Sequence, residues 1–151
     1  PCNLPVLQAY QEVKSSQIQT KLLGKVFKPR VYAQTGKLDK NRQANGISPN
    51  FVHSIDASHL MITLHVAKQL DIHSFAMVHD SYGTHAADAE EMWGALRTAF
   101  VEMYSQMDVL EEFRNYLLEV LPEHRHKEIE PIPTKGNLVL DHVLESSFFF
   151  A

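Results

Sequence analysis

The feature that most constrains the fold is the stretch FAMVHDSYGTH at positions 75–85. A short apolar run ends at Val78, the polar residues His79, Asp80 and Ser81 follow, and a second short extended run comes after them. Two such runs separated by polar turn residues are typical of a β-hairpin. The pattern therefore predicts a strand, a tight turn and a strand, with a charged aspartate at the apex.

Two interpretations of Asp80 stay open on spacing alone. A carboxylate between two apolar strands costs desolvation free energy unless a partner neutralises it. Asp80 could bond its own backbone two residues on, as turn aspartates do routinely. It could instead bind a divalent metal, because a carboxylate on a rigid turn that faces solvent suits Mg²⁺. A Ser-His-Asp triad is excluded, because successive residues here point to different faces and no GxSxG motif occurs.

The chain before the first expected helix divides into two segments. Residues 6–34 mix β-branched, aromatic and basic side chains, with Pro29 interrupting regular pairing, which predicts a twisted β-hairpin or an extended arm. Residues 35–50 are rich in turn formers and predict a solvated loop. The helix is then expected to begin at Ser54 or Asp56, either of which could cap it.

Helical periodicity dominates the rest of the chain. Apolar residues recur at helical spacing over 60–70, which predicts a largely buried helix. A helix of about five turns is expected after Asp88, whose spacing to a following glutamate resembles a capping box. A further helix is expected between Asp108 and Pro122, with a buried apolar stripe. With the hairpin, these helices predict an α+β fold.

Composition excludes several classes of protein. The 151 residues are 44% apolar and 21% charged, which is ordinary for one globular domain. The net charge of −4 excludes a uniformly basic coat for nucleic acid. The single cysteine, Cys2, excludes a disulfide framework and a cysteine zinc site, and suits a reducing compartment. No apolar run approaches a membrane span, so we expect a soluble protein with no membrane partner.

The basic residues are unevenly distributed. Half of them, seven of 14, lie within 22 positions that hold one acid, Asp39: these are Lys21, Lys25, Lys28, Arg30, Lys37, Lys40 and Arg42. Such a local excess could follow DNA phosphates, and a two-stranded ribbon can enter a major groove. A solvated charged face is the alternative. The sequence alone leaves both open.

A second polar cluster lies in SPNFVHSIDASHL at positions 48–60, where Asn50, His53, Ser54 and Asp56 come together. A loop followed by a helix cap accounts for Ser54 and Asp56 but leaves His53 unexplained. The chain has nine histidines but no HExxH motif or comparable pair. For the others, such as His59 and His65, we expect core or surface roles.

Six ordered segments carry a resemblance that spans nearly the whole chain: PVLQAY, IQTKL, GISPNFVHS, FAMVHDSYGTHAADA, KGNL and the terminal LESSFFFA. In these segments the sequence resembles the C-terminal end of the single-subunit, bacteriophage-type DNA-dependent RNA polymerases, a family that includes mitochondrial and plastid enzymes. The resemblance implies part of the palm and fingers of a right-hand polymerase. Residues 1–45 would form an extended arm and loop resembling the promoter-specificity hairpin. Residues 46–151 would form a palm portion, with the motif C hairpin packed on helices and a C-terminal foot.

The resemblance also assigns roles near the reacting groups. Asp80 would be the motif C aspartate, a catalytic residue that holds two Mg²⁺ ions, and Ser81 would follow it. His79 would lie beside the end of the growing RNA. His53 would line the minor-groove side of the nascent pair and help check the ribose. Asn50, Ser54 and Asp56 would support the segment that carries His53.

In the arm, the resemblance makes Lys28, Arg30 and Gln34 the candidates for contacting base edges in the promoter. The last residues, Phe150 and Ala151, would belong to the C-terminal foot that reaches toward the active site. The family's second metal-binding aspartate, in motif A, and the Lys and Tyr of motif B would lie upstream of Pro1. We therefore expect the chain alone to be inactive.

The implied activity of the full-length protein is template-directed nucleotidyl transfer to RNA, with Mg²⁺ as cofactor. Its partners would be promoter DNA, template DNA, nascent RNA and nucleoside triphosphates. Its place would be the cytoplasm of a bacterial host or of a prophage-bearing cell, or an organelle. A family A DNA polymerase palm is an alternative, disfavoured because Ser81 stands where a glutamate is common there. A non-catalytic nucleic-acid-binding module built on the basic segment is another.

Overall fold

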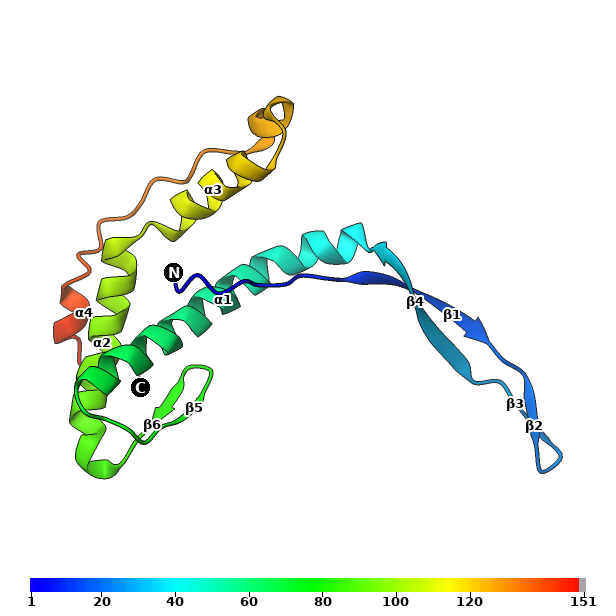
Figure 1. Ribbon diagram of the computed structural model, residues 1–151, viewed down its shortest axis with the longest axis horizontal. Coiled ribbons are helices and arrows are strands. Elements are labelled where there is room, and N and C mark those ends of the chain that lie inside the picture. The colour runs from blue at the N-terminus through cyan, green and yellow to red at the C-terminus, as the bar shows by residue number, and fades with distance from the viewer. Residues whose placement is uncertain (150–151) are drawn as a thin grey trace. The chain divides into compact units, whose positions relative to one another are not determined.

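The structure is a computed structural model that describes residues 1–149 (Figure 1). It divides into two compact units, one formed by residues 4–54 and the other by residues 1–3 together with the chain from Ile55 onward. Helix α1 (Lys40–Gln69) begins in the first unit and ends in the second.

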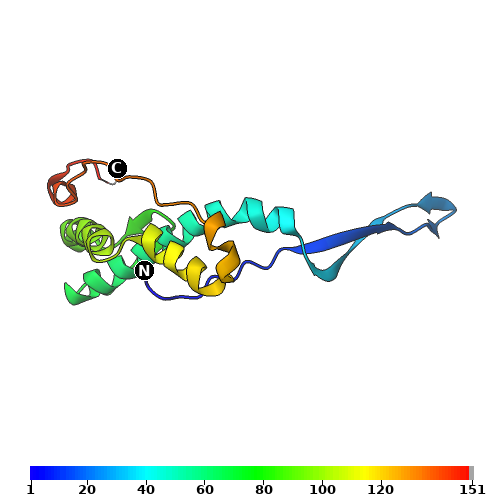
Figure 2. The ribbon, with the colours of Figure 1, turned by 90° about the horizontal axis from the view of Figure 1, so that it is seen from above.

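The unit of residues 4–54 contains the predicted β arm, which the structure confirms. Strand β1 (Gln11–Gln17) pairs antiparallel with β4 (Arg30–Leu38), and the shorter β2 (Thr20–Leu22) and β3 (Lys25–Phe27) form the tip of the ribbon, as Figure 2 shows. At the tip, Leu23 and Gly24 both have positive φ, 49° and 76°. Positive φ at both central residues marks a type I′ hairpin turn, whose twist matches that of the strands.

The prediction of a solvated loop over residues 35–50 is wrong. Strand β4 continues to Leu38 and α1 begins at Lys40. The intervening Asp39 caps the helix, because its Oδ1 accepts a hydrogen bond from the amide of Arg42 at 3.0 Å. An aspartate in this position satisfies one of the free amides of the first turn.

The prediction that a helix starts at Ser54 or Asp56 is also wrong, because α1 begins at Lys40 and both residues lie inside it. It passes through Gly46 and Pro49, two residues that destabilise a helix interior. Residues 8–10 lie against this part of the helix and hydrogen-bond to it. Those contacts offset the local cost of the two residues.

The other unit holds the hydrophobic core. Its buried residues come from the second part of α1, from the segment after it and from α2 (Ala89–Gln106): Val66, Ala67, Ile72, Met92, Ala95, Leu96 and Ala99. The predicted hairpin is present as β5 (Ala76–Val78) and β6 (Ser81–Gly83), and it packs on this core (Figure 1). The α+β class, the β-hairpin on helices and the five-turn helix are confirmed. The expected capping box is not, since the Asp88 side chain makes no cap hydrogen bond.

Beyond α2, helix α3 (Val109–Val120) is capped as predicted by Asp108, which accepts from the amides of Leu110 and Glu111 at 3.2 Å each. The buried stripe expected on α3 is wrong, because none of its residues is buried and Leu110 is 43% exposed. A short 3-10 turn, η1 (Ala86–Asp88), precedes α2, and η2 (Glu123–Glu128) and α4 (His142–Glu145) complete the chain. In residues 1–149 no helix is long and apolar enough to cross a bilayer.

Candidate functional site

The turn of the β5–β6 hairpin presents Asp80 to solvent. Val78 pairs with Ser81, so His79 and Asp80 alone connect the strands. His79 has φ of 52°, a left-handed conformation that costs about 1 kcal/mol or more for a residue other than glycine and persists where the surroundings impose it. Within residues 1–149 the Asp80 carboxylate has no hydrogen bond or ion pair. The alternative in which Asp80 bonds its own backbone is thus not realised.

The strands beneath this turn are anchored in the core. Met77 and Tyr82 are cross-strand partners and both pack against the buried cluster, whereas Val78 on the other face is 68% exposed. Opposite residues of an antiparallel pair share a face, so one face of the hairpin is fixed and the other is free. Asp80 consequently extends from a rigid base, although its own side chain is exposed.

A buried histidine ties the hairpin to the helices. His59 lies on α1, and its Nε2 is 3.0 Å from the carbonyl oxygen of Leu96. That oxygen can only accept, so Nε2 carries the proton and Nδ1 accepts from the Tyr82 hydroxyl at 3.3 Å. Burial lowers the pKa of His59, opposed by the Leu96 hydrogen bond and by the charge of Asp56. Burial also raises the pKa of the Tyr82 hydroxyl. Both groups are therefore neutral near pH 7.

A pocket of about 500 Å³ adjoins Asp80. It is lined by hairpin residues and by the α2 residues Met92, Trp93 and Leu96. Within residues 1–149, no three His, Cys, Asp or Glu side chains converge on a position where they could hold a metal ion. Asp80 offers hard, exposed carboxylate oxygens of the kind that Mg²⁺ prefers, but as a single ligand. A metal ion held by Asp80 would therefore need further ligands from elsewhere.

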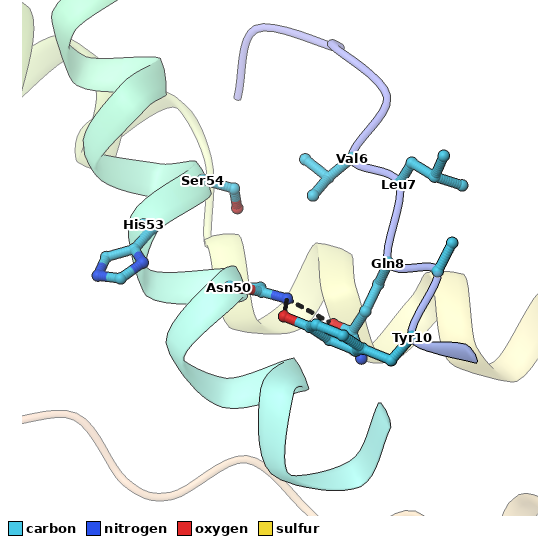
Figure 3. Close-up of a pocket in the computed structure, with 8 residues that line it drawn as sticks. Val6, Leu7, Gln8, Tyr10, Asn50, His53 and Ser54 are labelled. Atoms are coloured by element: carbon cyan, nitrogen blue, oxygen red, sulfur yellow. Dashed lines mark hydrogen bonds between the residues drawn. The ribbon is translucent and has the colours of Figure 1, made fainter. Parts of the chain in front are cut away.

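The cluster at positions 48–60 lies within α1 and not in a loop before a helix. Figure 3 shows Asn50 and Ser54 directed toward the segment of residues 6–10, with the His53 ring turned away from Tyr10. The Asn50 amide donates to Gln8 Oε1 and to the Tyr10 hydroxyl, at 3.1 Å each. His53 is exposed. Asn50 and Ser54 thus face a pocket formed with the N-terminal segment, and His53 at its rim remains accessible.

The Ser54 hydroxyl donates to the carbonyl of Phe51 at 2.7 Å, a local helix contact. Asp56 is half-buried and lies in the other unit, where its charge acts on His59, Tyr82 and Tyr104. Ser54 and Asp56 thus do not begin a helix; both lie inside α1.

The candidate residues of the arm are exposed. Arg30 and Gln34 lie on β4 with Tyr32 between them, and all three are exposed. Residues two apart on a strand share a face, so these three form one row. Lys28 lies between β3 and β4, also exposed. In the described part of the chain no ion pair involves a basic residue of the segment 21–42. Except for Arg42, whose guanidinium lies over the Tyr10 ring, their charges are available to a partner.

The C-terminal segment is held by a buried arginine that the sequence did not single out. Arg97 is 1% exposed, and its guanidinium donates to the carbonyls of Ser146 and Trp93. Phe149 contacts Phe100, with ring centroids 4.7 Å apart. The foot candidates Phe150 and Ala151 lie outside the described residues. From its sequence alone, a charged residue such as Arg97 is expected at the surface, so no local pattern indicates its burial.

Comparison with known proteins places this arrangement in a family. A family profile described as DNA-dependent RNA polymerase matches residues 1–128. The chain belongs to the phage-type, single-subunit family of DNA-dependent RNA polymerases. It is 39% identical over 155 residues to T7 RNA polymerase of Escherichia phage T7, covering all of this chain. It is 34% identical to the mitochondrial DNA-directed RNA polymerase of Schizosaccharomyces pombe, covering 99% of this chain.

The polymerase relatives differ in length. The chain spans only 17% of the phage T7 enzyme and 15% of the Schizosaccharomyces pombe enzyme. It is also 38% identical to DNA-directed RNA polymerase 1A of Nicotiana tabacum, over 91% of that sequence. Family membership therefore holds for this stretch of sequence, which spans a small part of the long relatives and most of the short one.

Proposed function

We propose that this chain provides the motif C carboxylate and the promoter-recognition arm of a DNA-directed RNA polymerase. The observation that carries the proposal is Asp80: an exposed carboxylate on a two-residue turn whose strands are packed on a buried core. A group that must meet a metal and a substrate has to be accessible and fixed in position at once. Membership of the polymerase family supplies the reaction class.

The proposed reaction is nucleotidyl transfer. The 3′ hydroxyl oxygen of the RNA attacks the α-phosphorus of a nucleoside triphosphate, a new P–O bond forms, the bond to the bridging oxygen of the β-phosphate breaks, and pyrophosphate leaves. The hydroxyl proton passes to solvent. Divalent metal ions, when bound, make the attacking oxygen more nucleophilic and stabilise the charge of the leaving group. Asp80 would contribute one carboxylate to hold them, the second coming from a motif A aspartate upstream.

The neighbours of Asp80 take supporting roles in this proposal. His79, whose strained backbone sets the direction of the turn, would lie beside the RNA terminus, and Ser81 would begin the strand that returns to the core. On α1, the exposed His53 would meet the minor-groove side of the nascent pair. Asn50 and Ser54 would hold the segment around it. Each role is supported by the family motif, together with the exposure of the histidines or the contacts of Asn50 and Ser54 in this structure.

The arm would recognise the promoter. The division into residues 1–45 as arm and 46–151 as palm portion, with Phe150 and Ala151 in the foot, belongs to this proposal. Lys28, Arg30 and Gln34 are the proposed contacts, supported by their exposure on a ribbon narrow enough for a major groove. Promoter and template DNA, nascent RNA and nucleoside triphosphates would be the partners of the full-length enzyme, in a bacterial cytoplasm or an organelle.

Two assays test the proposal. The chain alone, incubated with promoter DNA, Mg²⁺ and ribonucleoside triphosphates, should give no transcript, because one carboxylate cannot assemble the site; a robust product would contradict it. The full-length protein should incorporate ribonucleotides in strong preference to deoxyribonucleotides. Preference for deoxyribonucleotides would support the alternative of a family A DNA polymerase.

A non-catalytic nucleic-acid-binding module is the second candidate, favoured by the unpaired basic residues of the arm. It predicts salt-dependent binding of duplex DNA by the chain. It also predicts that the full-length protein synthesises no RNA. The synthesis assay separates the two candidates.

A further inference from the structure

The aromatic ring of Tyr10 rests in a seat on the first part of α1, formed by Arg42, Gly46 and Asn50. The Arg42 guanidinium carbon is 5.4 Å from the ring centroid, and the Asn50 amide donates to the hydroxyl at 3.1 Å (Figure 3). A Cβ at Gly46 would come within 2.5 Å of the ring carbon Cε2. Residues four apart lie on one helix face, so the three form a continuous surface under one ring.

A second set of polar contacts holds the residue two positions earlier. The Gln8 amide donates to the Gln43 backbone carbonyl at 2.6 Å and to Gln43 Oε1 at 2.8 Å. In return, the Gln43 amide donates to the Gln8 carbonyl at 2.7 Å. Asn50 serves both sets, because its amide also donates to Gln8 Oε1 at 3.1 Å. The segment of residues 8–10 is therefore fixed on α1 at several points.

The seat lies where the arm leaves the helix. Tyr10 directly precedes β1, and its carbonyl accepts a hydrogen bond from the amide of Asp39 at 2.9 Å. Asp39 in turn joins the end of β4 to the cap of α1. Both strands of the ribbon are thus attached to α1 next to the Tyr10 ring.

Glycine at position 46 destabilises the helix, so its presence there calls for a local reason. Alanine is preferred over glycine in a helix interior, because glycine loses more backbone freedom on folding. In α2, Gly94 shows the ordinary case, since a Cβ there would meet no atom within 4 Å. At position 46 a Cβ would have to displace the Tyr10 ring. The close approach of that ring explains why glycine occupies the position.

We propose that Gly46 and Asn50 are positioning residues that set the direction of the arm by seating Tyr10, and so determine how it meets duplex DNA. The inference rests on the proposed function of the arm for its consequence, but the seat itself is independent of that function. Neither residue needs to touch the nucleic acid. A substitution at Gly46 should change promoter affinity through the arm and leave the step at Asp80 intact.

The test compares Gly46→Ala with Gly94→Ala in the full-length polymerase. Hydrogen exchange by mass spectrometry, on peptides that cover residues 36–40 and 8–12, follows the Asp39 amide and the seat. Gly46→Ala should speed exchange there roughly tenfold and weaken promoter affinity by a similar factor, corresponding to about 1.4 kcal/mol. Gly94→Ala should change neither quantity. Extension of a primed template without a promoter should be unaffected by both variants.

A double-mutant cycle distinguishes displacement of the Tyr10 ring from a general effect of alanine on helix α1. Once Tyr10→Ala has removed the ring, Gly46→Ala should cause no further increase in exchange, since nothing remains to be displaced. Asn50→Ala should loosen the same peptides more weakly. If Gly46→Ala slowed exchange or matched Gly94→Ala, or if its effect persisted in the Tyr10→Ala background, the inference would be wrong. If exchange responded as expected but the unchanged protein did not bind its promoter, the seat would stand and the arm's proposed function would fail.

Discussion

The β5–β6 hairpin and the β1–β4 ribbon are both two-stranded and antiparallel, but they are stabilised by different means. The hairpin packs Met77 and Tyr82 into a hydrophobic core, and His59 bonds to it from α1. The ribbon is exposed along almost its whole length and is attached at its base by polar side chains around Tyr10. In the proposed function, the hairpin needs a fixed position because it carries a metal ligand, whereas the arm needs exposed side chains to contact DNA.

The difference has a thermodynamic side. A two-stranded ribbon without a packed face is only marginally stable in water. The ribbon therefore depends on its type I′ turn, its attachment to α1 and, in the proposal, the nucleic acid itself. The hairpin depends on burial. Substitutions in the two regions should accordingly affect different measurements.

The largest effect is expected at the hairpin turn. In the full-length enzyme, Asp80→Asn should reduce the rate of nucleotide addition by about 10³-fold or more, or about 4 kcal/mol, because it removes a charged metal ligand. Promoter affinity should stay within about twofold of the parent, since the affinity is assigned to the arm. Single-turnover extension and filter binding measure the two quantities.

Asp71→Asn is the control for Asp80→Asn, since Asp71 is another exposed aspartate, in the segment before the hairpin, and its Oδ1 lies 2.9 Å from His73 Nε2. It should leave extension nearly unchanged. Comparable rates for Asp80→Asn and the parent would contradict the metal assignment.

A substitution in the buried core should lower the free energy of unfolding more than a substitution on the exposed ribbon. Met92→Ala, at a residue that is 3% exposed, should lower the free energy of unfolding by about 2–5 kcal/mol. Val31→Ala on the ribbon should change it by about 0.5 kcal/mol or less. Urea unfolding of the 151-residue chain, followed by circular dichroism and by the fluorescence of its single tryptophan, Trp93, provides the measurement. Equal losses in the two variants would mean that the ribbon has a core of its own.

For promoter binding, positive charge should matter on the ribbon and not at the end of α1. Arg30→Gln should weaken promoter binding by several fold and reduce the slope of log affinity against log salt by about 1, because it removes one positive charge from the DNA interface together with the proposed base contact. Lys68→Gln, at an exposed basic residue in the last turn of α1, should change neither. Titrations at several salt concentrations test this. An unchanged slope for Arg30→Gln would remove that residue from the interface.

The smallest effect concerns pH. Because burial lowers the pKa of His59 in the folded state, the unfolded chain binds a proton more readily, and stability falls as the pH drops below about 6.5. The loss should reach about 1 kcal/mol or less between pH 6.5 and 5.5. His59→Gln should flatten this part of the profile in urea unfolding. A profile that keeps its slope in the variant would show that other groups cause it.

Local patterns predicted the local structures well. The hairpin at Asp80, the helix after Asp88, the Asp108 cap and the arm all follow from residues that lie close together in the sequence. Each depends on contacts within a short window, which a single sequence displays directly. The same holds for the candidate carboxylate, since its exposure follows from its place at the apex of a turn.

Long-range contacts explain what the sequence did not show. Helix α1 continues through Gly46 and Pro49 because residues more than 30 positions earlier pack on it, so turn formers alone misplaced its start. The stripe on α3 has the spacing of a buried face, but no element of the described chain covers the whole of it. The buried Arg97 satisfies its charge with main-chain carbonyls of the C-terminal segment, which no sequence pattern reveals.

The most direct test of the account is a crossed experiment in the full-length enzyme. Asp80→Asn and Arg30→Gln are compared in two assays, promoter binding and extension of a primed template that lacks a promoter. We expect Asp80→Asn to lose extension and keep binding, and Arg30→Gln to lose binding and keep extension. Loss of both activities in each variant, or loss of neither, would contradict the assignment of catalysis to the hairpin and recognition to the arm.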